Sequence, residues 1–293
     1  MAMPRPRVLR WRSGAPRKGC YARLRWDGSA ERAGAPGATM RHKGERLIIW
    51  ALRVGVLCAI LLIWSIAAGQ VGRNLIASPT ETMRAALRLI AEGRLFDAAA
   101  DSLRVFLSGF AVAAVLGVLT GIAMGSFRLV GRTLDIFVYA LAATPRVAFI
   151  PLVIVLLGLG IEAKAFIVFL GAIMPIIINT YTGVLAVDEE LLEMARSVGA
   201  GRMRVFSRIV LPSALPFTVA GLRIGATIGL INTVVAELYT AVSGLGGLLA
   251  VFGNTFRMAE YFVIVLSLAA IGVMVTEALR LIEARLGRWR GRA

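Results

Sequence analysis

The sequence feature that constrains this chain most is a series of about six apolar blocks, each about 20 residues long and separated by short charged segments. A helix of that length crosses the hydrocarbon core of a bilayer. Apolar side chains make up 58% of the 293 residues, and charged side chains only 17%. A water-soluble protein of this size carries more charge, so we predict an all-α integral membrane protein with about six transmembrane helices.

The blocks define where the predicted spans lie: 47–69, 103–126, 134–157, 165–184, 217–239 and 261–281. The connections are expected to be an amphipathic extracytoplasmic helix within 70–102, a basic cytoplasmic turn at 127–133 and a tight extracytoplasmic turn at 243–247. The arginines of the termini and of the segment after the fourth block place those parts in the cytoplasm.

The predicted transmembrane domain, 47–285, is flanked by two basic cytoplasmic segments. Residues 1–46 are expected to be largely a disordered tail, and 286–293 form a basic C-terminus. Met40 begins a segment typical of the start of a membrane protein, which leaves open that the stretch upstream is an artefact of start-site choice.

Composition excludes several other classes of function. The net charge is +16, but the basic residues are spread between the apolar blocks instead of forming one nucleic-acid-binding domain. Cys20, Cys58 and His42 cannot build a disulfide framework or a metal cluster. The sequence also lacks the glycine-rich ATP-binding motif and any nucleophile beside a base, so we expect no catalytic residues and no cofactor bound by this chain.

The longest charged interruption, Glu193 to Pro212, has its own helical pattern. Its first half is predicted to be a short amphipathic helix that stops at Gly199. Its second half is predicted to be a second short helix, with Arg204 and Arg208 on one side, which Pro212 ends. A bent pair of helices with exposed arginines between two spans is typical of a docking surface for a soluble partner.

Glycines recur at every fourth position of the second block, at Gly117, Gly121 and Gly125. Such a strip lets another transmembrane helix approach closely, so we predict that this face packs against a neighbouring span.

Polar residues inside the apolar blocks are candidates for a translocation pathway: Pro145, Arg146, Asn179, Asn232 and Glu237. A proline breaks the hydrogen-bond ladder next to Arg146, which is a candidate contact for an anionic solute. Structural pairing of Arg146 with an acid or a carbonyl group is an equally open interpretation. Glu237 is expected to be mainly structural, bonded to the nearby glycine turn, with pathway lining as the alternative.

The residues of the docking segment also resemble a known motif. Glu193, Ala195, Gly199, Ile209, Leu211 and Pro212 have the spacing of the "EAA loop" in permease subunits of ABC importers, with Met194 where alanine is usual. Other motifs, among them Pro145-Arg146, Asn179-Thr180 and Ala236-Glu237, are similar to the nitrate, sulfonate and taurine branch of the binding-protein-dependent permeases. The resemblance covers about residues 47 to 285.

The resemblance implies a permease in the bacterial inner membrane that acts with a second copy of itself, two ABC ATPase subunits and an extracytoplasmic substrate-binding protein. ATP is then hydrolysed by the partner, and the solute is a small anion. The residues expected to couple to the ATPase are Glu193, Ala195, Arg196, Gly199, Ala200, Arg204, Phe206, Ile209, Leu211 and Pro212.

Three alternatives remain open. Leu156-Leu157 stands where the family often has an aromatic pair, so the solute could instead be a thiamine-pyrimidine precursor or riboflavin, as in relatives of the same branch. A secondary transporter could show similar apolar blocks, although the two halves show no evident repeat. A membrane scaffold without transport could carry the same docking segment.

Overall fold

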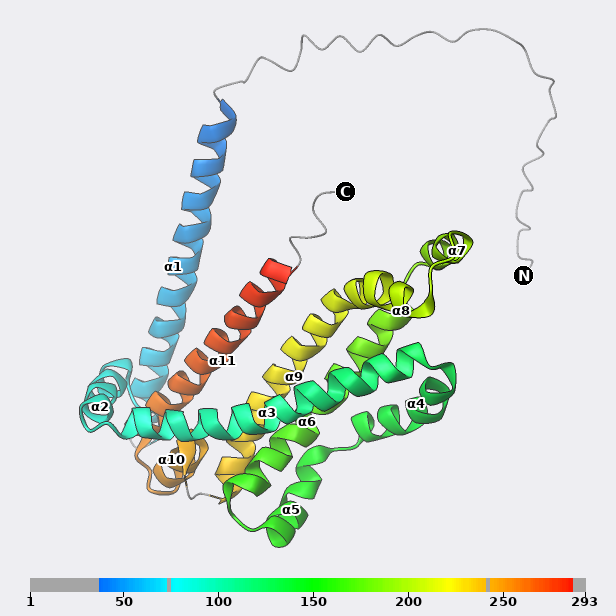
Figure 1. Ribbon diagram of the computed structural model, residues 1–293. Coiled ribbons are helices and arrows are strands. Elements are labelled where there is room, and N and C mark those ends of the chain that lie inside the picture. Colours follow the sequence, from blue (N-terminus) through cyan, green and yellow to red (C-terminus); the bar gives the residue numbers. More distant parts are fainter. Residues whose placement is uncertain (1–36, 73–74, 241–242, 287–293) are drawn as a thin grey trace, which may run out of the picture. The chain divides into compact units, whose positions relative to one another are not determined.

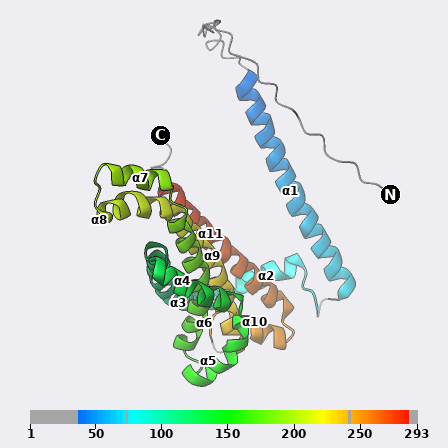
Figure 2. The same ribbon diagram turned by 90° about the vertical axis from the view of Figure 1, so that its right-hand side faces the viewer.

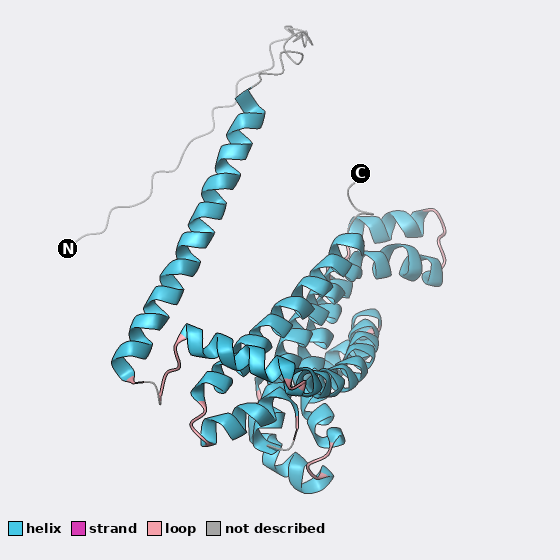
Figure 3. Cartoon of the chain, turned by 90° about the vertical axis from the view of Figure 1, so that its left-hand side faces the viewer, coloured by secondary structure: helices cyan, strands magenta, loops and turns pink. Residues whose placement is uncertain are grey.

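The computed structural model describes residues 37–72, 75–240 and 243–286, which form helices joined by turns, with no strand among them (Figures 1 and 3). In chain order, the principal helices are α1 (Gly37–Val71), α2 (Pro79–Ala91), α3 (Arg94–Ser126), α4 (Arg128–Ala143), α5 (Ile150–Leu157), α6 (Ile161–Leu185), α7 (Glu189–Ser197), α8 (Arg202–Val205), α9 (Leu211–Thr240), α10 (Gly244–Asn254) and α11 (Met258–Leu286). Five of the described helices are long and apolar enough to span a membrane, or six if a bent pair counts as one span.

The chain divides into two units, residues 1–58 and 59–293. In the first unit, the described part is the N-terminal portion of α1, which begins at Gly37. Residues 37–46 are therefore helical, and the prediction of a disordered tail was wrong for them. The rest of that predicted tail and the C-terminal segment 287–293 lie outside the described residues.

In the second unit, the predicted amphipathic helix within 70–102 is present as α2. Ser78 caps it: its hydroxyl accepts a hydrogen bond from the Glu81 amide, and the Glu81 side chain accepts one from the Ser78 amide. The second span starts earlier than the predicted Leu103, because α3 begins at Arg94 directly after Gly93. The added turns bury Ala98 against α2, α10 and α11, a stabilisation that hydropathy alone does not reveal.

The glycine strip of α3 packs on α6, as predicted. A Cβ atom at Gly121 would lie 2.7 Å from Cβ of Thr180 and 2.8 Å from the carbonyl oxygen of Ile177. Gly117 and Gly125 approach Ile176 and Val184 in the same way. The two helices therefore pack backbone to backbone along several turns, and α9 covers another side of α6.

The third apolar block, predicted as one span, is a sharply bent pair of helices. The bend between α4 and the segment that begins at Arg146 is 82°. Thr144 is extended, with φ −75° and ψ 132°, because the ring of Pro145 restricts the residue before it. The basic residues 128–133, predicted to form a turn, are instead the first turns of α4.

The predicted tight turn at 243–247 is the start of a helix, α10. With 11 residues α10 is too short to cross a bilayer. Its Leu245 and Phe252 are fully buried and pack with Leu89 of α2 and Ile264 of α11. Two views place α10 at one end of the second unit and α7 with α8 at the other (Figures 1 and 2).

Candidate functional site

The segment Asp188–Pro212, called here the α7–α8 segment, connects the ends of α6 and α9. Asp188 caps α7, since its carboxylate accepts a hydrogen bond from the Glu190 amide at 2.9 Å. Gly199 has a φ of +71°, and its turn is closed by the Ala200 amide, which donates to the carbonyl oxygen of Ala195 at 2.9 Å. The helix, glycine turn and second helix predicted from the sequence are therefore present.

Pro212 does not end the second helix, which corrects the sequence prediction. The chain stays helical from Arg202 to Thr240, with a π-helical stretch at Phe206–Val210 immediately before α9. In this stretch the Leu211 amide donates to the carbonyl oxygen of Phe206, five residues back, directly before the proline that cannot donate a hydrogen bond. Ile209, Leu211 and Pro212 thus form a rigid helical connection between the α7–α8 segment and α9.

The surface of the α7–α8 segment is both apolar and basic. Val198 and Met203 each expose 77% of their surface, and Met194 exposes 62%. Ala195 is buried, whereas the predicted coupling residues Glu193, Arg196 and Arg204 are exposed and Phe206 is half-buried. Exposed apolar side chains beside charges are typical of a surface that binds another protein.

The Arg146 side chain contacts two backbone carbonyl groups, each at a place where helical hydrogen bonding is interrupted. One guanidinium nitrogen, Nη2, donates to the carbonyl oxygen of Ala142 at 3.3 Å, at the end of α4. The other, Nη1, lies 3.5 Å from the carbonyl oxygen of Gly171, which lacks its usual helical donor because residue 175 is a proline. Arg146 is thus paired with backbone carbonyl groups, as one of the two interpretations expected. It also lines a small cavity of about 210 Å³ with Leu141, Thr144, Phe149, Leu170 and Met174.

Asn232 of α9 contacts α6 at Gly171, the residue whose carbonyl oxygen Arg146 also approaches. A Cβ atom at Gly171 would overlap the amide nitrogen of Asn232, so the two residues are in direct contact. Asn232 is buried, and its amide nitrogen has no hydrogen-bond partner among the described residues. Arg146 and Asn232 therefore both place hydrogen-bond donors beside Gly171.

Asn179 and Glu237 lie elsewhere. Asn179 donates to the carbonyl oxygen of Pro175 at 2.8 Å, within α6 and about two turns from Gly171. Glu237 is completely buried at the end of α9. The structure thus brings together only two of the candidate pathway side chains, Arg146 and Asn232.

Glu237 joins three helices through one oxygen. Its Oε2 accepts hydrogen bonds from the Ser102 hydroxyl at 2.8 Å and from the Gly246 amide at 2.9 Å. The Ser102 oxygen in turn accepts from the Leu245 amide at 2.8 Å. The expectation that Glu237 bonds to the glycine turn is confirmed, and the turn is the N-terminus of α10, where a carboxylate is favourable.

Two charged groups at this end of the molecule were missed by the sequence reasoning. Lys164 of α6 is 2% exposed, and its ammonium donates to the Ser243 hydroxyl at 2.9 Å. A charge directly before the apolar block that begins at residue 165 is the signal that could have identified it.

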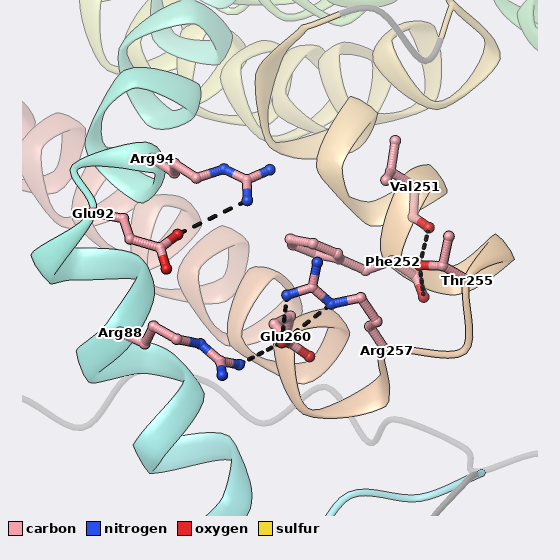
Figure 4. Close-up of polar contacts among 8 residues, drawn as sticks. All are labelled: Arg88, Glu92, Arg94, Val251, Phe252, Thr255, Arg257 and Glu260. Atoms are coloured by element: carbon pink, nitrogen blue, oxygen red, sulfur yellow. Dashed lines mark hydrogen bonds and ion pairs between the residues drawn. The ribbon is translucent and has the colours of Figure 1, made fainter.

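The second missed group is Glu260 of α11, which is 6% exposed (Figure 4). Its Oε1 accepts hydrogen bonds from Arg88 of α2 at 2.5 Å and from Nη2 of Arg257 at 2.7 Å. The Arg257 guanidinium also lies 4.9 Å from the ring centre of Phe252. This arrangement ties α2 to the α10–α11 turn.

The chain matches known proteins over most of its length. Residues 113–288 match the family model described as "Binding-protein-dependent transport system inner membrane component". The chain belongs to this family. It is therefore a multi-pass permease subunit of an ABC importer, a transport protein and not an enzyme.

Curated relatives agree with that assignment, and a solved structure shares the fold. The chain is 31% identical to the taurine transport system permease protein TauC of Escherichia coli, over 82% of this chain and 90% of that protein. It is 27% identical to the nitrate import permease protein NrtB of Synechocystis, over 80% of this chain and 88% of that protein. A structure of the methionine ABC transporter MetNI has the same fold, with a TM-score of 0.58, 19% identity and coverage of 66% of this chain and 95% of that one.

Proposed function

We propose that this permease carries a small anion, such as a sulfonate or nitrate, and that an ATPase drives it by binding the α7–α8 segment. The exposed apolar and basic surface of that segment carries the proposal, because its second half continues as a helix into α9 and its first half follows α6 after a turn of three residues. ATP is hydrolysed by the partner, and movement of the ATPase changes the positions of helices that lie against Arg146 and Asn232.

The proposed assembly contains two permease copies, two ATPase subunits and an extracytoplasmic binding protein that delivers the solute. Both termini and the α7–α8 segment then face the cytoplasm. The arginines of that segment, Arg196, Arg202, Arg204 and Arg208, support this orientation.

A pair of substitutions at Gly199 tests the coupling step. No atom lies within 4 Å of a Cβ built at Gly199, so only its left-handed backbone limits replacement. Asparagine adopts that conformation readily and β-branched valine does not. We expect Gly199→Asn to retain the ATPase on co-purification from membranes, and Gly199→Val to lose most of it at an unchanged permease level. Equal retention by both variants would contradict the proposed contact.

Substitutions at Arg146 test the solute contact. Uptake of taurine, an alkanesulfonate and nitrate is compared with uptake of riboflavin and a thiamine pyrimidine precursor, in cells with the complete transporter. If the guanidinium attracts the anion, Arg146→Lys keeps more anion uptake than Arg146→Gln, since lysine retains the charge. An equal loss of anion uptake in both variants would mean that Arg146 acts only through its backbone contacts. Uptake restricted to riboflavin or the thiamine pyrimidine precursor would refute the anionic substrate.

A further inference from the structure

A groove of about 970 Å³ separates the α7–α8 segment from the C-terminal end of α3. One wall consists of α3 residues, including Leu119 and Ile122, and of Phe127 directly after α3; the other wall includes Arg196, Arg202 and Met203. Neither wall contributes a carboxylate among the described residues that line it. The groove is therefore positive on one side and apolar on the other.

The apolar wall continues along the exposed side of α3. Val112, Val115, Leu116 and Leu119 are exposed and follow the helical spacing of a single face. They lie within the candidate span Arg94–Ser126, and Leu119 is about 10 Å from the end of that span. This strip leads directly into the groove, where the two arginines stand opposite.

The continuity of the exposed apolar strip favours one kind of occupant for the groove. A soluble protein bound at the α7–α8 segment would leave the strip at 112–119 uncovered, whereas an acyl chain covers it along its length. A second copy of this chain, placed symmetrically, would bring its own arginines toward Arg196 and Arg202. A molecule with an apolar tail and a negative head fits both walls.

We propose that this groove binds an anionic phospholipid, with an acyl chain on the exposed strip of α3 and the headgroup phosphate on Arg196 and Arg202. Basic pockets beside transmembrane helices on the cytoplasmic side bind such headgroups. The site rests on the proposed function for its orientation, since the anionic lipid must be in the cytoplasmic leaflet. A phospholipid bound in this groove would contact the α7–α8 segment directly and stabilise its position.

The test uses the purified full-length permease without the ATPase. Native mass spectrometry measures the adducts formed with phosphatidylglycerol and with phosphatidylcholine of the same acyl chains. We expect wild type to prefer phosphatidylglycerol, and Arg196→Gln/Arg202→Gln to weaken that binding about tenfold while phosphatidylcholine binding is unchanged. The matched control is Arg204→Gln/Arg208→Gln, which removes two charges from the same segment but none from the groove lining.

Three results would overturn the site: no lipid preference in wild type, unchanged binding in the groove variant, or an equal loss in the control variant. Equal loss would mean that the lipid responds only to net charge. Because no ATPase is present, failure of the lipid site is distinguishable from failure of the coupling proposal, which the Gly199 variants test separately. A melting temperature measured in detergent verifies that each variant is folded.

Discussion

The carboxylate of Glu237 shows how much a single buried side chain can do in this protein. It accepts both of its hydrogen bonds with Oε2, and Oε1 has no hydrogen-bond partner among the described residues. Replacing the whole group by a methyl leaves the Ser102 hydroxyl and the Gly246 amide without an acceptor. Glutamine, by contrast, still offers one carbonyl oxygen in the same place.

We expect Glu237→Ala to lower the free energy of unfolding by about 2 kcal/mol, because two buried hydrogen bonds, each contributing about 1 kcal/mol, are lost. Glu237→Gln should cost clearly less. The measurement is the thermal unfolding midpoint in detergent, followed for both variants and wild type. Identical midpoints for the two variants would show that the carboxylate is not an acceptor in this network.

Arg146 was identified from the sequence as costly to bury, but its partners were not. The proline at position 175 removes the normal donor to Gly171, and a side chain from 25 residues away approaches the freed carbonyl. Sequence reasoning left the structural and solute-binding interpretations open because it could not measure which groups lie within reach. The structure provides the carbonyl contacts, and only transport measurements test the solute.

At the scale of helices, the α3–α6 contact depends on small residues. Gly121→Ala places a methyl 2.7 Å from Cβ of Thr180 and 2.8 Å from a backbone oxygen that cannot rotate away. We expect a cost of about 1–3 kcal/mol, the range for overpacking in a well-packed core. Thermal unfolding in detergent measures it.

The control for that substitution is Gly272→Ala in α11, where a Cβ atom meets nothing within 4 Å. Both substitutions replace glycine by alanine within a helix and therefore raise helix propensity by the same amount, so any difference in stability between the two variants comes from packing. A Gly121 variant as stable as the Gly272 variant would mean that α3 and α6 are not in close backbone contact.

The Glu260 cluster makes a second prediction about helices. Replacing Glu260 by glutamine removes the negative charge that pairs with both Arg88 and Arg257, whereas replacing Arg88 leaves the ion pair with Arg257 intact. Arg88 is also partly exposed, at 56% of its side chain, so its own pair contributes only about 0–1 kcal/mol. We therefore expect Glu260→Gln to lower the unfolding midpoint in detergent more than Arg88→Gln does. The reverse order would show that Arg257 contributes little.

At the scale of the whole molecule, the α7–α8 segment and α10 mark opposite ends of the second unit (Figures 1 and 2). Single cysteines at Val198 and Thr255, both exposed, report which end faces which compartment. In a background with Cys20→Ser and Cys58→Ser, we expect a membrane-impermeant maleimide to label only Thr255→Cys in right-side-out vesicles and only Val198→Cys in inverted ones. Labelling of Val198→Cys from outside would exclude any cytoplasmic ATPase contact.

The sequence by itself determined the class of the protein, most of the spans and the bent α7–α8 segment. These features depend on the length of apolar runs, on helical periodicity and on glycine, which act over a few residues and can be read along the chain. The motif at Glu193 to Pro212 also identified the family, which the comparisons confirmed.

Only the tertiary structure decided which distant residues meet. Ser102 and Glu237 are 135 positions apart, and no local pattern pairs them. The same holds for α10, an apolar helix that reads as a turn until Leu89 and Ile264 are seen to cover it. Hydropathy measures the preference of a segment for an apolar environment. Both lipid and neighbouring helices supply such an environment, and only the packing of the folded chain shows which of the two surrounds a given segment.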